Sequence, residues 1–168
     1  MDITIRRARP EEYETLGDLT AQAYLDGGHL DHGAADRYLH VLRDVAGRAA
    51  HAEILVAAAD GGAPHALLGG VTFVPSGGPM ADIARDGETE IRMLAVSPTA
   101  RGRGVGELLV RGCVERSREA GRTRLVLSSS PSMRTAHRLY ERLGFARAPE
   151  RDWYPIPGLP LLAYALTL

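Results

Sequence analysis

The sequence predicts a mixed α/β domain, in which a central β-sheet of about six or seven strands is flanked by about four helices. The length of 168 residues suits a single domain, over residues 1–168, with a buried core. Apolar residues make up 45% of the chain and charged residues 24%, which are ordinary values for a globular protein. Strand patterns follow one another in the first half and alternate with helical patterns in the second, which indicates a mixed sheet.

The first half contains three predicted strands and two predicted helices. Residues 3–8 alternate apolar and polar side chains, as a half-buried strand does. Pro10, followed by two glutamates, suits the first turn of a helix. Apolar residues recur at helical spacing over 38–49, which predicts a second helix. The segments 52–59 and 66–74 are typical of strands, with a hairpin turn at 60–65 between them.

The second half alternates strands with helices. After a loop over 76–87, we expect in order a strand, a helix, a strand, a helix and two closing strands, at 88–96, 104–120, 123–129, 132–144, 145–149 and 161–168. Gly121 and Gly144 are typical residues for the ends of the two helices. The complete order is therefore strand, helix, helix, three strands, helix, strand, helix and two strands.

Charge and composition exclude several classes of protein. The net charge of −1 argues against a broad nucleic-acid-binding surface. The single cysteine, Cys113, cannot form an internal disulfide, and its position on an apolar helix face indicates a core residue. The first residues do not resemble a signal peptide, and no run approaches the roughly 18 apolar residues of a membrane span. We therefore expect a soluble, cytoplasmic protein with no nucleic-acid or membrane partner.

A glycine-rich stretch, Arg101-Gly102-Arg103-Gly104-Val105-Gly106, separates the strand 88–96 from an amphipathic helix. Free backbone N–H groups and the positive dipole end at a helix N-terminus bind anions, and glycines allow close approach of a ligand. The dinucleotide-binding pattern fails here because residue 107 is glutamate, and the nucleoside-triphosphate loop is absent. The stretch therefore predicts a site for another phosphate ligand, with a flexible, solvated basic loop as the alternative.

The pattern R-x-x-G-x-G at 101–106, together with A-x-x-L-Y-E-x-x-G-F at 136–145, resembles the two hallmark motifs of the GCN5-related N-acetyltransferases. The predicted element order also resembles the fold of that family over nearly the full chain. The resemblance implies acetyl-coenzyme A as co-substrate, with no metal. It implies transfer of the acetyl group to a primary amine by direct attack in a ternary complex.

The resemblance also assigns roles to individual residues. The backbone of Leu94, Ala95 and Val96 is expected to pair with the pantetheine arm of the cofactor. The pyrophosphate is expected at the backbone amides of Arg101, Gly102, Arg103, Gly104, Val105 and Gly106. Tyr140 matches the general acid that reprotonates the departing thiolate, since a phenol of pKa near 10 is a donor at neutral pH. A core aromatic residue is the alternative reading of Tyr140.

The chain departs from the family at one position. The asparagine that often hydrogen-bonds pantetheine, three residues before the motif alanine, is Met133 here, a side chain without a strong donor. We expect a nearby serine, Ser128, Ser129 or Ser132, or a water to substitute for it.

The general base is less clearly indicated by the sequence. Glu90 occupies the strand position at which several family members carry a catalytic glutamate, and it could accept the ammonium proton directly or through a water. The alternative is an exposed glutamate that pairs with Arg92. Glu88 and Glu53 are weaker candidates.

The identity of the acceptor is left open by the sequence. His29 and His32 have a spacing that a metal site could use, but nothing completes a ligand set. The aromatic, proline-rich segment 151–160, with Trp153 and Tyr154, is expected as a loop that shapes the acceptor pocket or a dimer contact. We expect a small-molecule amine as acceptor and a monomer or homodimer. The alternatives are acetylation of a protein N-terminus or lysine, and a non-catalytic acyl-coenzyme-A-binding sensor.

Overall fold

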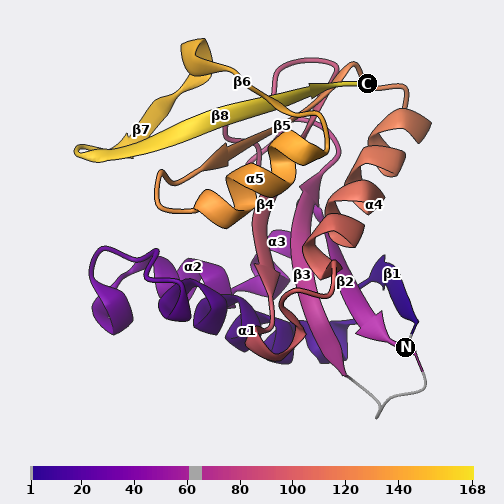
Figure 1. Ribbon diagram of the computed structural model, residues 1–168, viewed down its shortest axis with the longest axis vertical. Coiled ribbons are helices and arrows are strands. Elements are labelled where there is room, and N and C mark those ends of the chain that lie inside the picture. Colours follow the sequence, from indigo (N-terminus) through magenta and orange to yellow (C-terminus); the bar gives the residue numbers. More distant parts are fainter. Residues whose placement is uncertain (1, 61–65) are drawn as a thin grey trace.

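The computed structural model describes residues 2–60 and 66–168, and in this part of the chain one eight-stranded sheet runs in the order β1-β2-β3-β4-β5-β8-β6, with β7 paired to β8 (Figure 1). The strands are β1 (Ile3–Arg7), β2 (Glu53–Ala59), β3 (Leu67–Val74), β4 (Glu88–Val96), β5 (Arg124–Ser129), β6 (Ala146–Arg147), β7 (Trp153–Ile156) and β8 (Leu159–Thr167). β4 and β5 are parallel, and the other neighbours are antiparallel. The predicted mixed sheet is therefore confirmed.

Helices cover both faces of the sheet (Figure 1). They are α1 (Tyr13–Asp26), α2 (Tyr38–Arg43), α3 (Val45–Ala49), α4 (Val105–Glu119) and α5 (Arg134–Arg142). Alternate residues of β2 show the division: Leu55 belongs to a hydrophobic cluster with residues of α4 and α5, whereas Ile54 belongs to a cluster with residues of α1 and α3. This alternation follows from the period of two in a strand, which sends successive side chains to opposite faces. Each face thus has its own hydrophobic core.

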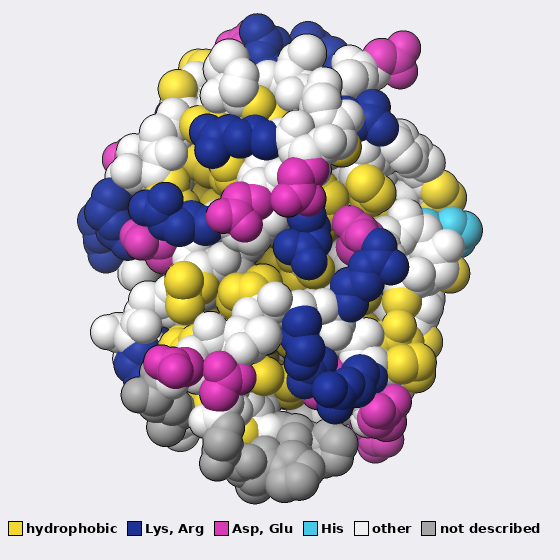
Figure 2. Space-filling view, turned by 90° about the vertical axis from the view of Figure 1, so that its right-hand side faces the viewer, with side chains coloured by type: hydrophobic (Ala, Val, Ile, Leu, Met, Phe, Trp, Pro, Cys, Tyr) yellow, Lys and Arg dark blue, Asp and Glu magenta, His cyan; other side chains and the backbone are white. Residues whose placement is uncertain are grey.

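The surface that carries α4 has a mixed charge pattern. Figure 2 shows arginine and acidic side chains interspersed on this face rather than gathered by sign. Glu107, for example, lies between Arg111 at 3.3 Å and Arg142 at 3.2 Å. Among residues 2–60 and 66–168, no helix combines the length and apolar character that crossing a bilayer requires.

Two predicted elements differ from the observed ones. The helix expected over 38–49 is broken at Asp44, where ψ is 64° and the carboxylate accepts a hydrogen bond from the Gly47 amide at 3.0 Å. Asp44 thus ends α2 and caps α3 because its short side chain competes for backbone N–H groups. The sequence predicts a loop over 151–160, but this segment contains β7, the turn after it and the start of β8. The hairpin turn expected at 60–65 lies almost wholly outside the described residues.

Candidate active site

The parallel pairing of β4 with β5 stops half-way along β4. It covers Glu88 to Ile91, whose partners are Arg124 to Leu127, and β4 then continues for five more residues to Val96 without a β5 partner. From Ser128 onward, β5 pairs only with β8. The backbone of Leu94, Ala95 and Val96 therefore lies where the two parallel strands have separated. The resemblance to the family implies the pantetheine arm at these three residues.

A β-bulge marks the point of separation. The register between β3 and β4 shifts between Gly70, which faces Ala95, and Thr72, which faces Arg92. Met93 adopts φ +55°, and it is the one non-glycine residue with positive φ in the described part of the chain. A side chain in this region of φ is uncommon and is a feature of functional sites, and a bulge re-aims the strand.

The glycine-rich loop has the backbone that its sequence predicts. Gly102 and Gly104 adopt φ +77° and +76°, a left-handed conformation that favours glycine, and Gly104 is the N-cap of α4. A Cβ atom added at either position would have no heavy atom within 4 Å, so both positions face open space. This open, positively polarised helix N-terminus fits a pyrophosphate group.

The loop, the separated strand and α5 meet at one glycine. A Cβ atom at Gly106 would lie 3.3 Å from Leu139 Cδ2 on α5 and 3.7 Å from Val96 Cγ2 on β4. The absence of a side chain at Gly106 therefore lets the N-terminus of α4 approach both neighbours. The two motifs that lie about thirty residues apart in the sequence are thereby joined in space.

Tyr140 lies on α5 and belongs to the core cluster beneath α4. Its ring packs against Phe145 and Tyr164, with centroids 5.6 and 5.9 Å away. Burial raises the pKa of Tyr140 above its ordinary value, and Cys113 and Tyr164 add to the shift. The phenol is therefore protonated at neutral pH, and among the described residues its hydroxyl forms no hydrogen bond.

Glu90 is completely buried, and one of its carboxylate oxygens accepts three hydrogen bonds. Glu90 Oε1 accepts hydrogen bonds from the backbone amides of Asp82, Ile83 and Ala84 at 2.9–3.0 Å. Glu90 Oε2 is also buried, but it has no hydrogen-bond partner within the described chain. Burial raises the pKa of Glu90, and the hydrogen bonds oppose this shift. The side chain thus fixes the 82–84 loop and keeps one free acceptor oxygen.

The exposed Glu90–Arg92 ion pair that the sequence also allowed does not form. Arg92 instead pairs through Nε with Asp82 Oδ2 at 3.1 Å and donates to the carbonyl oxygen of Met80 at 3.1 Å. Glu90 and Arg92 are two residues apart on β4, so their side chains lie on the same face of the sheet. Their backbones are about 7 Å apart, and this distance allows the two side chains to have different partners.

The serines near Met133 already have hydrogen-bond partners. Ser128 Oγ accepts from Trp153 Nε1 at 2.9 Å, and Ser129 Oγ lies 3.0 Å from His137 Nε2. Ser132 Oγ lies 2.9 Å from His29 Nδ1. Of these, Ser132 stands directly before Met133, the N-cap of α5, at the entrance to the motif helix.

The remaining sequence candidates have structural roles. Glu88 pairs with Arg151 and Glu53 with Arg7, so neither carboxylate is free. Cys113 is buried, which raises the pKa of its thiol to about 12. Within residues 2–60 and 66–168, no three His, Cys, Asp or Glu side chains come together as metal ligands.

Sequence reasoning missed several residues on the Glu90 face of the sheet. Arg48 of α3 donates from Nε to Thr72 Oγ1 at 3.1 Å, and Thr72 faces Arg92 across the strands. The rings of Tyr24 and Tyr38 lie 6.3 Å apart on the same side, and Tyr38 lies beside Arg92. One signal was available, because Arg48 stands three residues after the buried Val45 and so falls on the apolar face of its helix.

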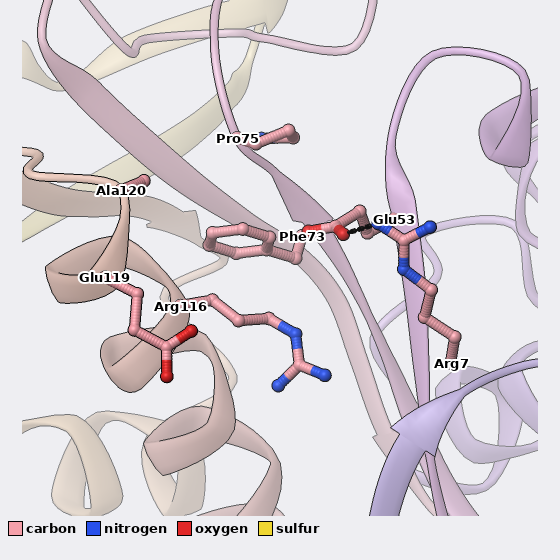
Figure 3. A pocket seen from close by; sticks show the side chains of 7 residues that line it. All are labelled: Arg7, Glu53, Phe73, Pro75, Arg116, Glu119 and Ala120. Atoms are coloured by element: carbon pink, nitrogen blue, oxygen red, sulfur yellow. Dashed lines mark hydrogen bonds and ion pairs between the residues drawn. The ribbon is translucent and has the colours of Figure 1, made fainter.

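An open hollow lies at the other end of α4 and is not part of this site (Figure 3). Figure 3 shows it between the C-terminal turn of α4 and the neighbouring strands, lined by Arg7, Glu53, Phe73, Pro75, Arg116, Glu119 and Ala120. The glycine-rich loop lies at the N-terminus of the same helix, so the full length of the helix separates the two places.

Two curated proteins are similar in sequence to part of this chain. An N-acetylaspartate synthetase from Danio rerio is 34% identical over 74 residues, which are 44% of this chain and 26% of that protein. An uncharacterized N-acetyltransferase from Schizosaccharomyces pombe is 34% identical over 92 residues, which are 55% of this chain and 52% of that protein. The chain thus spans a quarter to a half of the length of these curated relatives.

Solved structures show the same fold over the whole chain. A GNAT-family acetyltransferase from Staphylococcus aureus Mu50 superposes with a TM-score of 0.76 at 14% identity, covering 99% of both chains. The PaiA N-acetyltransferase from Thermoplasma acidophilum, solved in complex with coenzyme A, gives a TM-score of 0.74 at 14% identity over 100% of both chains. The sequence model of the acetyltransferase (GNAT) family matches residues 13–145, and the chain belongs to this family.

Proposed function

We propose that this protein is an acetyl-coenzyme-A-dependent N-acetyltransferase that acts on a primary amine, with a small molecule as acceptor. The observation that carries the proposal is the separation of β4 from β5 beside the glycine-rich N-terminus of α4. The strand backbone and the loop amides adjoin α5 there, where Gly106 lies against Leu139. Together with the hydroxyl of Tyr140 on α5, they match the chemistry of a long, phosphate-bearing thioester.

Each part of the cofactor has a complementary group. The amides of 101–106 bind the pyrophosphate, since Gly102 and Gly104 leave open space for it. The backbone of Leu94, Ala95 and Val96 satisfies the pantetheine amides, because β5 no longer pairs with this segment. The thioester then lies near the bulge at Met93, between the Glu90 face of the sheet and Tyr140.

The reaction needs one proton acceptor and one proton donor. The amine nitrogen attacks the thioester carbonyl carbon, a C–N bond forms, and the C–S bond breaks. Glu90 Oε2, the unpartnered oxygen, takes the proton that the nitrogen loses, directly or through a water. Tyr140 gives its proton to the departing thiolate, and solvent restores both groups.

A small amine suits the site better than a protein chain does. The Glu90 face is lined by buried side chains of α1 and α2 and by Arg48 of α3, and the 82–84 loop is attached to Glu90 by three hydrogen bonds. One relative is also named for an acetylated small molecule, N-acetylaspartate.

The test is release of coenzyme A thiol with a panel of amines, read together with acetyl-coenzyme A binding by calorimetry. We expect binding without an amine and thiol release that depends on one. Binding without release for any small amine, N-terminal peptide or lysine peptide would instead identify a non-catalytic acyl-coenzyme-A sensor.

A further inference from the structure

Two arginines meet on the acceptor side of the sheet. Thr72 of β3 and Arg92 of β4 are cross-strand partners, and their side chains therefore project from the same face. Arg48 reaches the same place from α3 and donates from Nε to Thr72 Oγ1 at 3.1 Å. The two guanidinium groups are close enough that the charge of Arg92 acts on Arg48.

In the described part of the chain, one of these two arginines is paired with a carboxylate and the other is not. Arg92 pairs with Asp82 at 3.1 Å, but Arg48 is 4% exposed and forms no ion pair within the described residues. Its hydrogen bonds go to neutral oxygens only, Thr72 Oγ1 and the carbonyl oxygen of Val41. The nearest acid along the chain, Asp44, caps α3 through the Gly47 amide.

Arg151, a second buried arginine, has a carboxylate partner. Arg151 is 7% exposed, and it forms a two-point ion pair with Glu88 at 2.7 and 3.1 Å. That pair raises the pKa of Arg151, whereas burial lowers the pKa of Arg48 and the charge of Arg92 lowers it further. A buried charge without a partner is costly, so a site that retains one is suited to an anionic ligand.

The distance between the two arginines and the candidate base Glu90 indicates what kind of ligand fits. Glu90 and Arg92 are two residues apart on one strand, so their side chains leave the backbone about 7 Å apart. A molecule of a few bonds can therefore present an amine to Glu90 and an anion to the arginines. Tyr24 and Tyr38 lie beside this place and supply aromatic walls and hydroxyl groups.

We propose that the acceptor is a small amine that carries a carboxylate, an amino acid or a close analogue, and that Arg48 and Arg92 bind this carboxylate. The proposal rests on the acetyltransferase function proposed above and adds the acceptor class to it. Guanidinium groups bind carboxylates through paired hydrogen bonds, and the same contacts hold the amine beside Glu90.

The first experiment compares matched acceptors with the wild-type protein. Amino acids are assayed against their carboxamides and against the corresponding amines without a carboxyl group, with phosphoethanolamine as a phosphate-bearing arm. We expect kcat/KM to be at least about tenfold higher for the carboxylate-bearing member of each pair, since a charge-assisted hydrogen bond is lost without it. Equal rates within the pairs, or preference for the phosphate arm, would overturn the proposal.

The second experiment removes the arginines. Arg48→Met and Arg92→Met should each raise KM for the preferred amino acid about 10- to 100-fold. The KM for the matching carboxamide should rise by a much smaller factor, so that the preference for the amino acid is lost. Arg43→Met, which removes an exposed arginine of α2 that lies 3.6 Å from Asp18, is the matched control and should leave both substrates unaffected. Equal losses for amino acid and carboxamide would contradict carboxylate binding. If Arg48→Met does not fold, Arg92→Met and the wild-type pairs decide.

Calorimetry of the same amino acids in the presence of coenzyme A separates the two proposals. If the wild type binds the amino acid but does not acetylate it, and Arg48→Met does not bind it, the acetyltransferase function is overturned and the carboxylate site is supported. Turnover of amines without any preference for a carboxylate would support the function and overturn the site.

Discussion

Arg151 and Glu88 form a buried two-point ion pair, with Arg151 Nη2 at 2.7 Å from Glu88 Oε1 and Nη1 at 3.1 Å from Oε2. Arg151 Nη2 also donates to the carbonyl oxygen of Ile83, and the amide of Ile83 donates to Glu90. The segment after β6, the loop before β4 and the candidate base thus belong to one hydrogen-bonded network. The loop that closes the acceptor side is fixed from two directions.

We predict that Arg151→Met lowers the free energy of unfolding by about 3 kcal/mol, because it leaves Glu88 buried with only the Arg85 amide and a 3.8 Å contact with Arg124. Urea denaturation followed by circular dichroism measures this loss. The double variant Arg151→Met, Glu88→Met should be less destabilised than the single one, since it leaves no buried charge behind. Arg111→Met, which breaks an exposed pair with Glu107, is the control and should cost far less, since exposed ion pairs contribute little to stability. A single-variant loss no larger than the control's would contradict the prediction.

Glu12 should make the free energy of unfolding depend on pH in the acid range. Its carboxylate accepts two hydrogen bonds from Arg6 and one from the Arg9 amide, all at 2.8–2.9 Å. The Arg6 hydrogen bonds, against the effect of burial, lower the pKa of Glu12 from 4.5 to about 2. Because the folded pKa is the lower one, the folded state binds fewer protons, and this stabilisation is complete above pH 4.5 and lost as the pH falls towards 2.

The corresponding variant is Glu12→Gln. It should lose up to ~3 kcal/mol of unfolding free energy at pH 7, since each pKa unit corresponds to about 1.4 kcal/mol. The difference from wild type should shrink as the pH falls from 4.5 to about 2. Glu14→Gln, an exposed neighbour on α1, should match wild type throughout. A difference between wild type and Glu12→Gln that stays constant with pH would show that shape rather than charge matters at this position.

The fold was predictable where local backbone chemistry decides it. Gly121 and Gly144 both have positive φ, and the sequence predicts a helix end at each of them. The break at Asp44 was missed because apolar spacing continues through it, while a side-chain hydrogen bond to Gly47 ends the helix. The strand β7 was missed because Pro155 argues against a strand, and β7 tolerates it as a short segment paired only with β8.

The candidate site was predictable in part. Its cofactor side follows one contiguous stretch, 94–106, and a second motif, so the resemblance to the family's two motifs is enough to propose it. Its acceptor side brings Arg48, Thr72 and Arg92 together from α3, β3 and β4, and no spacing in the sequence relates them. The burial of Glu90 was also hidden, because its partners are backbone amides of a loop, which carry no residue signature.

Gly104→Asp tests the anion site. The carboxylate would project from the N-cap of α4 into the open space assigned to the pyrophosphate, and like charges at close range repel. We expect most of the coenzyme A affinity to be lost in calorimetry, with the fold retained. Gly104→Asn is the matched control, since asparagine has nearly the same shape, tolerates left-handed φ and is neutral. Equal coenzyme A affinity of the two variants would show that a negative charge at position 104 does not affect binding.

Tyr140→Phe tests the proton donor. It removes one hydroxyl and little volume from a residue that packs against Phe145 and Tyr164. Because general acids contribute about 100- to 10,000-fold, turnover should fall by that order while acetyl-coenzyme A affinity stays near normal. Stopped-flow thiol release and calorimetry measure the two quantities. Nearly full turnover would assign Tyr140 to the core alone.

Glu90→Gln tests the base and separates its two roles. The amide oxygen of glutamine can still accept the hydrogen bonds from the 82–84 loop, so the loop should keep its place, but the proton-accepting charge is gone. Turnover at neutral pH should therefore fall, and alkaline buffer should partly restore it, because more of the amine is then already free of its proton. In the wild type the rate should fall as acid protonates Glu90. This loss should begin above pH 4.5, the ordinary value, since burial raises the pKa of the carboxyl.

The pH–rate profile distinguishes this role from the alternatives. An equal loss at every pH would make Glu90 a residue that positions the loop, and an unchanged profile would remove it from the reaction. Glu88→Gln is a useful comparison, because Glu88 lies on the same strand but is paired with Arg151. It should lose stability without acquiring alkaline rescue. Rescue confined to Glu90→Gln would therefore assign the proton transfer to the carboxylate that has an unpartnered oxygen.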